Sequence, residues 1–598
     1  MASRARLLLL SFAACGMACQ SAGTRTPTPA GGTPAAGAAA TTAPAIPARA
    51  TVQFPSTWRF RSGDSAHFAE RGMIASNSRL ASEAGIEIVR AGGNAVDAAV
   101  AVGFALAVTY PVAGNLGGGG YMVIRMADGR TAALDYREIA PLAASRDMYL
   151  DSAGNVTEES VVGYRASGVP GAVAGMLEAL AKYGTKSRAE ALAPALRLAR
   201  DGFVVDSALS RSLTGSKRLI ARFSGRAVFY PNDSALKPGT LFKQPPLAAT
   251  LQRIIEHGAK GFYEGPTADS LVAEMARGGG LITAEDLRRY RAIWRTPIAA
   301  THRGYQLITM PPSSSGGTTI TESLNLLEAF PQVPPWGTAG YVHLLGSAYQ
   351  RAFIDRNSKL GDPDFVSVPL AQLTSKDYAR TLAKTIDPQR ATPTPRDGKQ
   401  IVDGVHTTHY SVVDDKGNAV ATTTTINNGY GSGVYLTSVG FFMNDEMDDF
   451  ASAPGKPNMF GLVQGEVNAI APGKRMLSAM SPTIVLDPQG GLLLVAGAAG
   501  GPRIITTTSQ VILNVIQHNM TLADAMRAPR IHHQALPDTL MVETGGLTPD
   551  AESALKAMGH AIRYTGGLAN ANAVMRVRGG WHGVSEPRAS GERGTAGY

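Results

Sequence analysis

The stretch that decides the fold reads His406-Thr407-Thr408-His409-Tyr410-Ser411-Val412-Val413, then Asp414-Asp415-Lys416-Gly417-Asn418, then Ala419-Val420-Ala421-Thr422-Thr423-Thr424-Thr425. Two runs rich in β-branched residues flank a cluster of turn-forming residues, which predicts a β-hairpin. A turn over residues 414–417 pairs Thr407 with Thr424, whereas a loop one residue longer pairs it with Thr425. Either register puts Thr407 beside Thr425 and Asn427, at the end of the second strand.

The position of Thr407 suggests a chemistry. A threonine hydroxyl is a weak nucleophile until a base accepts its proton, and one such base is the threonine's own α-amino group. That group has a pKa of about 8 when free, which suits a base at neutral pH. In the intact chain it is locked in the peptide bond to His406. Attack of the Thr407 hydroxyl on the preceding carbonyl can cut the chain between His406 and Thr407, giving two fragments that stay together.

This stretch resembles the γ-glutamyltransferase (γ-glutamyltranspeptidase) family of N-terminal nucleophile hydrolases. The resemblance rests on Thr407-Thr408-His409-Tyr410-Ser411-Val412-Val413 and on further motifs, in the family's order, from about Leu80 to Tyr598. It implies a fold of mixed α/β class, a four-layer αββα sandwich. It also implies one precursor that is split into a large fragment, 51–406, and a small catalytic fragment, 407–598, which together form one folded unit.

The resemblance assigns the catalytic roles. Thr407 is the nucleophile and Thr425 orients it. Gly500 and Gly501 match a glycine pair whose backbone N–H groups form an oxyanion hole. The family has proline before this pair and serine after it, where this chain has alanine and proline. Because both glycines keep their own N–H groups, the hole can survive these changes.

Two further motifs concern a substrate carboxylate. Arg137 begins the sequence Arg-Glu-Ile-Ala-Pro. An isolated Arg-Glu pair is usually a surface ion pair of little energetic value. In the resembling family, however, this arginine binds the substrate α-carboxylate, for which a guanidinium fork is well suited. Ser478 matches the first of two adjacent serines that contact the same carboxylate, and Ala479 replaces the second, which removes one hydroxyl donor.

An acidic cluster follows the hairpin. Glu446 and Asp449 are three residues apart, so on a helical turn they share a face while Asp448 points elsewhere. Such a cluster is normally a solvated turn. The resemblance implies instead that Glu446, Asp449 and Asn427 hold the substrate α-ammonium. Residues 451–474 match a lid loop over the pocket, in which Phe460 stands where the family has an aromatic residue.

The implied activity is that of a γ-glutamyltransferase and glutathione hydrolase. Thr407 attacks the γ-glutamyl amide of glutathione or a related compound, and water or an amino acid or peptide acceptor then resolves the γ-glutamyl-enzyme. One alternative is a glutaryl or cephalosporin-type acylase of the same fold. Glu446 and Asp449 argue against it, because two uncompensated acids in its pocket would be costly. The other alternative is a non-catalytic, lipid-anchored binding protein.

Upstream of the hairpin, the pattern predicts helices over residues 80–91 and 95–108, the second capped by Asn94 and apolar nearly all round. Four glycines, residues 117–120, come next. They do not predict a nucleotide site, because no Gly-Lys-Ser/Thr follows them and the pattern turns directly into a strand. We expect strands over residues 121–126 and 131–136.

The composition fits a large globular α/β protein, since 44% of the 598 residues are hydrophobic and 17% are charged. The formal net charge is +9, but residues 1–50 contribute +4 of it, from four arginines and no acid. The remaining net charge of +5 is spread over more than 500 residues, so it does not indicate nucleic-acid binding. No cysteine or histidine cluster has metal-ligand spacing, and His532 and His533 would point to opposite faces of a strand. We therefore expect no metal and no cofactor.

The N-terminus reads as an export signal, residues 1–19, in which Arg4 and Arg6 precede a short apolar run. Gly16-Met17-Ala18-Cys19 resembles a bacterial lipoprotein box, which leaves lipidation of Cys19 and simple cleavage as alternatives. Residues 20–50 are almost entirely Thr, Pro, Ala and Gly, which predicts a flexible tether. We expect an exported protein, periplasmic or lipid-anchored at the cell envelope of a bacterium.

Overall fold

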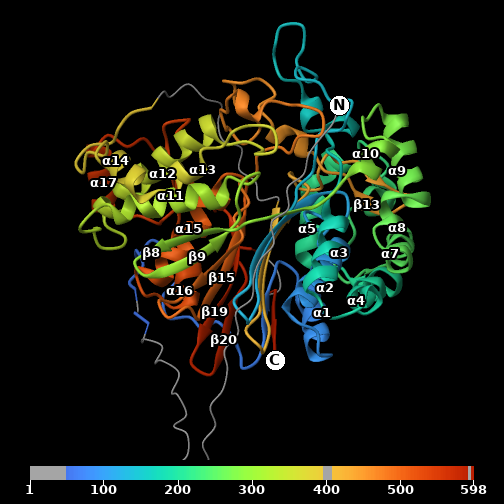
Figure 1. The fold of residues 1–598 in the computed structure, drawn as a ribbon, viewed down its shortest axis with the longest axis horizontal. Coiled ribbons are helices and arrows are strands. Elements are labelled where there is room, and N and C mark those ends of the chain that lie inside the picture. Colours follow the sequence, from blue (N-terminus) through green and yellow to red (C-terminus); the bar gives the residue numbers. More distant parts are fainter. Residues whose placement is uncertain (1–48, 51, 395–406, 590–593) are drawn as a thin grey trace, which may run out of the picture. The chain divides into compact units, whose positions relative to one another are not determined.

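The computed structural model describes residues 49–50, 52–394, 407–589 and 594–598 (Figure 1). The predicted signal, Cys19 and His406 therefore lie outside the described residues. The body that the model describes begins earlier than the predicted end of the tether, because the Ala50 N–H donates to the Asn519 carbonyl and the Arg49 guanidinium donates to the Val515 carbonyl.

Two seven-stranded sheets form the centre of the molecule, and within each all neighbouring strands are antiparallel. Sheet 1 has the order β21 (Thr595–Gly597), β2 (Met73–Ala75), β10 (Thr407–Val413), β11 (Ala419–Thr425), β3 (Gly119–Arg125), β4 (Thr131–Tyr136) and β7 (Ile293–Arg295). Sheet 2 has the order β1 (His67–Ala69), β20 (Gly580–Val584), β19 (Asn570–Val577), β15 (Leu492–Ala499), β14 (Thr483–Leu486), β9 (Tyr305–Thr309) and β8 (Ile298–His302).

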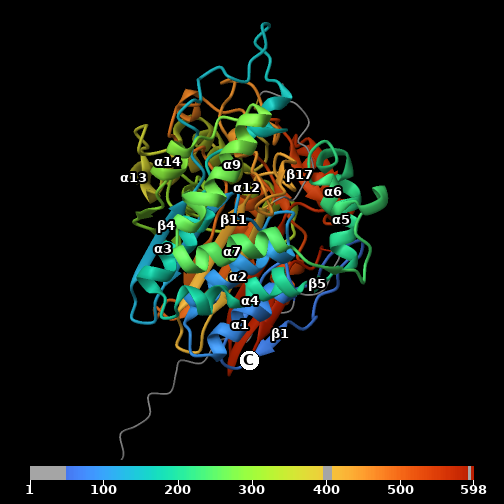
Figure 2. The ribbon, with the colours of Figure 1, turned by 90° about the vertical axis from the view of Figure 1, so that its right-hand side faces the viewer.

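Helices cover the outer face of each sheet (Figures 1 and 2). Over sheet 1 lie α1 (Arg79–Arg90), α2 (Ala95–Thr109) and α3 (Ala172–Tyr183), and α4 (Arg188–Asp201) packs on α2. Over sheet 2 lie α11 (Gly316–Glu328), α15 (Arg503–Ile516) and α16 (Leu522–Arg527), and α12 (Ala339–Lys359) packs on α11. The order helix, sheet, sheet, helix confirms the predicted αββα sandwich.

The remaining elements are peripheral. They are α5 (Ser207–Ile220), α6 (Arg226–Phe229), α7 (Pro245–His257), α8 (Lys260–Tyr263), α9 (Gly265–Gly278), α10 (Ala284–Arg289), α13 (Leu370–Leu373), α14 (Lys376–Ala383), α17 (Pro549–Ala557), β5 (Phe203–Val204), β6 (Leu241–Phe242), β12 (Tyr435–Leu436), β13 (Phe441–Phe442), β16 (Ile531–His532), β17 (Leu540–Glu543) and β18 (Ile562–Thr565). Among the described helices, none is long and apolar enough to cross a membrane.

The alternation of side chains along the hairpin explains the layers. Val412 and Val420 point to one face of sheet 1 and pack in the core beneath α2. Val413, Ala419 and Ala421 point to the other face and pack in the core between the two sheets. Both faces of β10 and β11 are therefore buried, which explains why these strands contain no charged residue and why α2, which covers them, is buried at every position.

The hairpin has the longer of the two predicted loops, and Thr407 therefore pairs with Thr425. Residues 414–418 form the loop. The carboxylate of Asp414 organises it by accepting the N–H groups of Lys416 and Asn418, each at 2.9 Å. The same carboxylate accepts the Ala95 N–H at the start of α2, at 3.0 Å, so the loop is also fixed to the helix layer.

The glycine run serves close packing of the backbone rather than anion binding. A β-carbon at Gly118 would lie 2.1 Å from the Thr425 carbonyl oxygen, and one at Gly120 would lie 2.5 Å from the Thr423 carbonyl oxygen. Only glycine lets this segment approach the end of β11 so closely. The predicted strands are confirmed as β3 and β4, and the two predicted helices as α1 and α2, the latter with Asn94 as its cap.

Candidate active site

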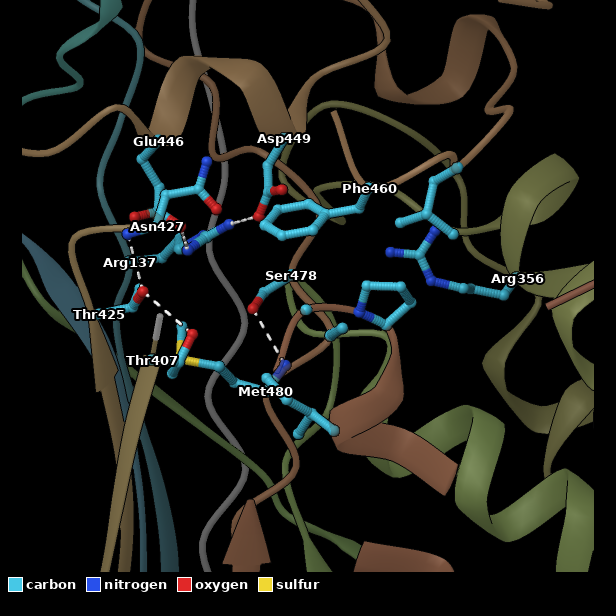
Figure 3. A pocket seen from close by; sticks show the side chains of 15 residues that line it. Arg137, Arg356, Thr407, Thr425, Asn427, Glu446, Asp449, Phe460, Ser478 and Met480 are labelled. Carbon is cyan, nitrogen blue, oxygen red and sulfur yellow. Dashed lines mark hydrogen bonds and ion pairs between the residues drawn. The ribbon is translucent and has the colours of Figure 1, made fainter. Parts of the chain in front are cut away.

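A small cavity lies at the end of the hairpin where Thr407 begins β10 (Figure 3). Its volume is about 20 Å³, which is enough to hold a water molecule. Most of the predicted site residues line it. The lining residues are Arg137, Arg356, Thr407, Thr425, Asn427, Glu446, Asp449, Phe460, Leu462, Ser478, Ala479, Met480, Gly501, Pro502 and Ile504.

The two threonine hydroxyls meet in this cavity, with Thr407 Oγ1 at 3.2 Å from Thr425 Oγ1. Thr425 Oγ1 also accepts the Asn427 N–H at 2.8 Å, which fixes its position. Asn427 has a φ of +69°, so the chain leaves the strand here. The side-chain amide of Asn427 donates to the Asp445 carbonyl at 3.0 Å. The end of β11 therefore presents one ordered hydroxyl to Thr407.

Arg137 lies at the centre of a charged cluster and is completely buried. Its Nη1 pairs with Glu446, its Nη2 pairs with Asp449, and its Nε donates to the Met476 carbonyl at 3.2 Å. Burial alone would lower the pKa of Arg137, but the two carboxylates outweigh it and hold that pKa well above its ordinary value. Burial raises the pKa of Glu446 and of Asp449, and Arg137 opposes both shifts.

The neighbouring Glu138 is also completely buried, so this Arg-Glu pair lies in the interior and not on the surface, where such pairs usually lie. Its carboxylate lies 3.7 Å from Arg137 Nη1, and neither oxygen has a hydrogen-bond partner among the described residues. Burial raises the pKa of Glu138 to about 7, although Arg137 opposes the shift. Glu138 thus lies behind the cluster as an acid that titrates near neutral pH.

The acidic turn is the 3₁₀ helix Glu446–Asp449, and it divides its acids as predicted. Glu446 and Asp449 face Arg137. Asp448 points away and accepts hydrogen bonds from the Ser160 hydroxyl at 2.9 Å and from the Met459 N–H at 3.1 Å. A solvated turn is ruled out by burial, because Glu446 is 1% exposed.

Ser478 sits opposite this turn in a loop held by a second loop. Its Oγ accepts the Met480 N–H at 3.1 Å, and its carbonyl accepts the Ser315 N–H at 2.8 Å and the Ser315 hydroxyl at 2.5 Å. The Ser314 hydroxyl donates to the Met480 carbonyl at 2.5 Å. Ser314 and Ser315 therefore position the loop that carries Ser478, and Ala479 lines the cavity without a hydroxyl.

Gly500 and Gly501 link the end of β15 to the start of α15, with φ values of +145° and +59°. Neither N–H donates to an acceptor within the described part of the chain. Gly501 lines the cavity at the positive end of the helix dipole, whereas Gly500 is not among the lining residues. A β-carbon on Gly501 would lie 2.8 Å from Phe460 Cδ1, so the Phe460 ring covers this glycine.

Arg356 is a site residue that the sequence patterns do not indicate. Arg356 lies near the end of α12 and lines the cavity, although it is only 1% exposed. Its sequence context, Ala352-Phe353-Ile354-Asp355-Arg356, is one of the motifs that resemble the family. Nothing in that pattern indicates that the arginine points inward while Ile354, on another face of the helix, is 45% exposed.

Comparison with known proteins gives the family. The gamma-glutamyltranspeptidase family model matches residues 81–596. The glutathione hydrolase proenzyme of Escherichia coli (strain K12) is 46% identical over 538 residues, which are 89% of this chain and 92% of that protein. The chain belongs to the γ-glutamyltranspeptidase family. It is therefore an enzyme with an N-terminal nucleophile hydrolase fold.

Two solved structures of related proteins agree with this family and fold. The cephalosporin acylase from Bacillus halodurans superimposes with a TM-score of 0.79 at 28% identity, covering 91% of this chain and 99% of that chain. The γ-glutamyltranspeptidase of Helicobacter pylori superimposes with a TM-score of 0.53 at 42% identity, covering 55% of this chain and 95% of that chain. The solved chain from H. pylori thus corresponds to only part of this one.

Proposed function

We propose that this member of the γ-glutamyltranspeptidase family is a γ-glutamyltransferase and glutathione hydrolase with Thr407 as its nucleophile. The observation that carries the proposal is the meeting of the Thr407 and Thr425 hydroxyls, 3.2 Å apart, in the cavity that also holds the Arg137 cluster and Gly501. The likeness to a relative named a glutathione hydrolase proenzyme supports the substrate and the need for processing.

The first step is the cut before Thr407, which frees its α-amino group. This group then accepts the hydroxyl proton while Oγ1 bonds to the γ-carbonyl carbon of the donor, with Thr425 orienting the hydroxyl. The N–H groups of Gly500 and Gly501 stabilise the tetrahedral oxyanion. The C–N bond breaks, the leaving amine takes the proton, and a γ-glutamyl ester remains on Thr407. Water, an amino acid or a peptide attacks this ester and restores the free hydroxyl.

The charged cluster gives the site its preference for a zwitterionic group. Glu446 and Asp449 carry two negative charges when ionised, and Arg137 compensates one of them. Arg137 therefore reduces the cost of burying these acids. The presence of two acids alone is for this reason weaker evidence against an acylase than the sequence indicates. The carboxylate that Arg137 does not compensate can pair with the ammonium group of a donor, which a glutaryl donor lacks. Ser478 and Asn427 complete the polar lining of the pocket.

Two measurements test this function. Mass spectrometry of the purified protein should find a fragment that begins Thr-Thr-His-Tyr, and γ-glutamyl p-nitroanilide should be turned over faster than glutaryl p-nitroanilide. Faster turnover of the glutaryl compound would support an acylase, a function that the likeness to the B. halodurans enzyme also supports. A soluble, single uncut chain would instead indicate a non-catalytic protein.

We propose further that the two fragments remain together as a heterodimer. The solved H. pylori chain, which matches 55% of this chain, supports a precursor that ends as two polypeptides. We also propose export to the cell envelope of a bacterium, with Cys19 as the candidate lipid attachment point. The apolar run after Arg4 and Arg6 supports export. The mass of the mature N-terminal peptide would report both the export cut and any lipid.

A further inference from the structure

Arg356 differs from the other charged residues of the cavity in its partners, which are all neutral. Its Nε donates to the Ser315 hydroxyl at 3.0 Å. Its Nη1 donates to Asn357 Oδ1 at 2.9 Å and to Gln464 Oε1 at 3.3 Å. Among the described residues, no carboxylate lies within ion-pair distance of this guanidinium, and no acceptor receives a hydrogen bond from its Nη2.

A buried guanidinium without a counter-ion is costly unless an anion joins it. Burial lowers the pKa of Arg356 to about 10, and Asp449 opposes this shift from a distance. Arg356 is therefore charged at neutral pH. Arg137, by contrast, has all three nitrogens engaged, two of them by carboxylates. In the described part of the cavity, the guanidinium with an uncommitted nitrogen is that of Arg356.

We propose that Arg356 is a second carboxylate-binding residue, whose Nη2 donates to the α-carboxylate of the γ-glutamyl group alongside Ser478. This inference rests on the proposed function. Arg356 and Ser478 belong to one hydrogen-bonded unit, because the Ser315 hydroxyl accepts from Arg356 and donates to the Ser478 carbonyl. Figure 3 shows Arg137 and Arg356 reaching the cavity from different sides.

Charge and donor count both favour this assignment. A carboxylate that approaches Arg137 also meets Glu446 and Asp449, which already occupy its fork and repel the newcomer. Arg356 attracts the carboxylate without first giving up an internal ion pair. Ala479 leaves the pocket one hydroxyl short of the family pattern, so an additional donor is needed to satisfy the carboxylate oxygens.

Three donors that differ only in their charged groups test the proposal. γ-Glutamyl p-nitroanilide carries the carboxylate and the ammonium, glutaryl p-nitroanilide carries the carboxylate alone, and γ-aminobutyryl p-nitroanilide carries the ammonium alone. We expect Arg356→Met to lower kcat/KM by about 10- to 100-fold for the two donors with a carboxylate, as for a lost charged hydrogen bond. For the γ-aminobutyryl donor we expect a change of less than about threefold.

Arg351 provides a matched control on the same helix. It is also buried and bonded only to neutral groups of Ser347, Gln350, Thr385 and Thr392, but it does not line the cavity. Arg351→Met should change kcat/KM equally for all three donors. Arg356→Lys keeps the charge and should retain more activity with the carboxylate donors than Arg356→Met. If Arg356→Met does not fold or is not cut, Arg356→Lys alone should still show a loss confined to the carboxylate donors.

Several results would overturn the assignment. Equal losses on all three donors would show a merely structural role, and unchanged kinetics would show no role. A loss with glutathione but not with γ-glutamyl p-nitroanilide would place Arg356 at the carboxylate of the leaving group. Failure of the proposed function would be a separate result, because it would appear in the unsubstituted enzyme as faster turnover of the glutaryl donor. The comparison of donors with and without a carboxylate would still test the role of Arg356.

Discussion

Replacing Thr425 by valine removes one oxygen atom and leaves the shape of the side chain almost unchanged. That oxygen lies 3.2 Å from Thr407 Oγ1 and accepts the Asn427 N–H at 2.8 Å. The substitution therefore has two separate consequences. The nucleophile loses the hydroxyl that orients it, and the Asn427 N–H, in a residue only 4% exposed, loses its acceptor.

The expected magnitudes follow from these two contacts. A buried N–H without an acceptor lowers the free energy of unfolding by about 1–3 kcal/mol. Loss of a hydrogen bond to the nucleophile raises the barrier by about 1 kcal/mol, which is about a fivefold loss of rate. The displacement of Asn427, which lines the substrate pocket, adds to this, so we expect kcat/KM to fall by about 10- to 100-fold. The cut before Thr407 should slow as well, because it uses the same hydroxyl.

Thr424→Val is the matched control. Thr424 is the next residue on the same strand, and its hydroxyl donates to the Gly119 carbonyl at 2.8 Å on the opposite face of sheet 1. The Thr424→Val variant should have a lower free energy of unfolding without a comparable loss of kcat/KM. Denaturant unfolding, the ratio of cut to uncut chain on a gel and kcat/KM with γ-glutamyl p-nitroanilide measure the three effects. The reasoning is refuted if Thr425→Val cuts and turns over like the unsubstituted enzyme, or if Thr424→Val slows turnover equally.

Three further substitutions give distinct outcomes. Thr407→Ala should remain a folded, single uncut chain without activity, and a cut chain on a denaturing gel would contradict this. Glu138→Gln should remove a pH dependence of stability: the pKa of Glu138 is raised from 4.5 to about 7, so the native state holds this proton more tightly and its stability falls as pH rises through that window. Denaturant unfolding at pH 4.5 and at about pH 7 should show a lower free energy of unfolding at the higher pH in the unsubstituted enzyme, and a smaller difference between the two pH values in the variant. Gly497→Ala should lower stability by about 1–3 kcal/mol, because the new methyl group would lie 2.4 Å from the His409 ring, and an unchanged melting temperature would refute this.

The hairpin could be predicted because its signals are local. Alternating β-branched residues on both sides of a turn cluster define the two strands, and only the loop length had to be learned from the structure. Asp414 decides it, since its carboxylate accepts two N–H groups of the longer loop. The orientation of the acids in the acidic turn could also be predicted from local spacing, because residues three apart, such as Glu446 and Asp449, lie on one face of a helical turn.

The roles of Glu138, Ser315 and Arg356 could not be predicted, because each depends on contacts with distant segments. Glu138 is buried, and its carboxylate lies close to Gly119 of β3, so a sequence pair typical of the surface is part of the interior. Ser315 contacts Ser478 across more than a hundred intervening residues. A sequence reveals the polar character of such residues but not the partners that bury them.

The interleaved order of strands also constrains how the enzyme is made. In sheet 1, β10 and β11 lie between β2 and β3, and in sheet 2 the strands β14, β15, β19 and β20 lie between β1 and β9. Each half of the chain thus inserts its strands between those of the other. Neither of the two proposed fragments would have a complete interior by itself. If the chain is cut before Thr407, we therefore expect the precursor to fold first, and we expect separately expressed fragments to assemble poorly.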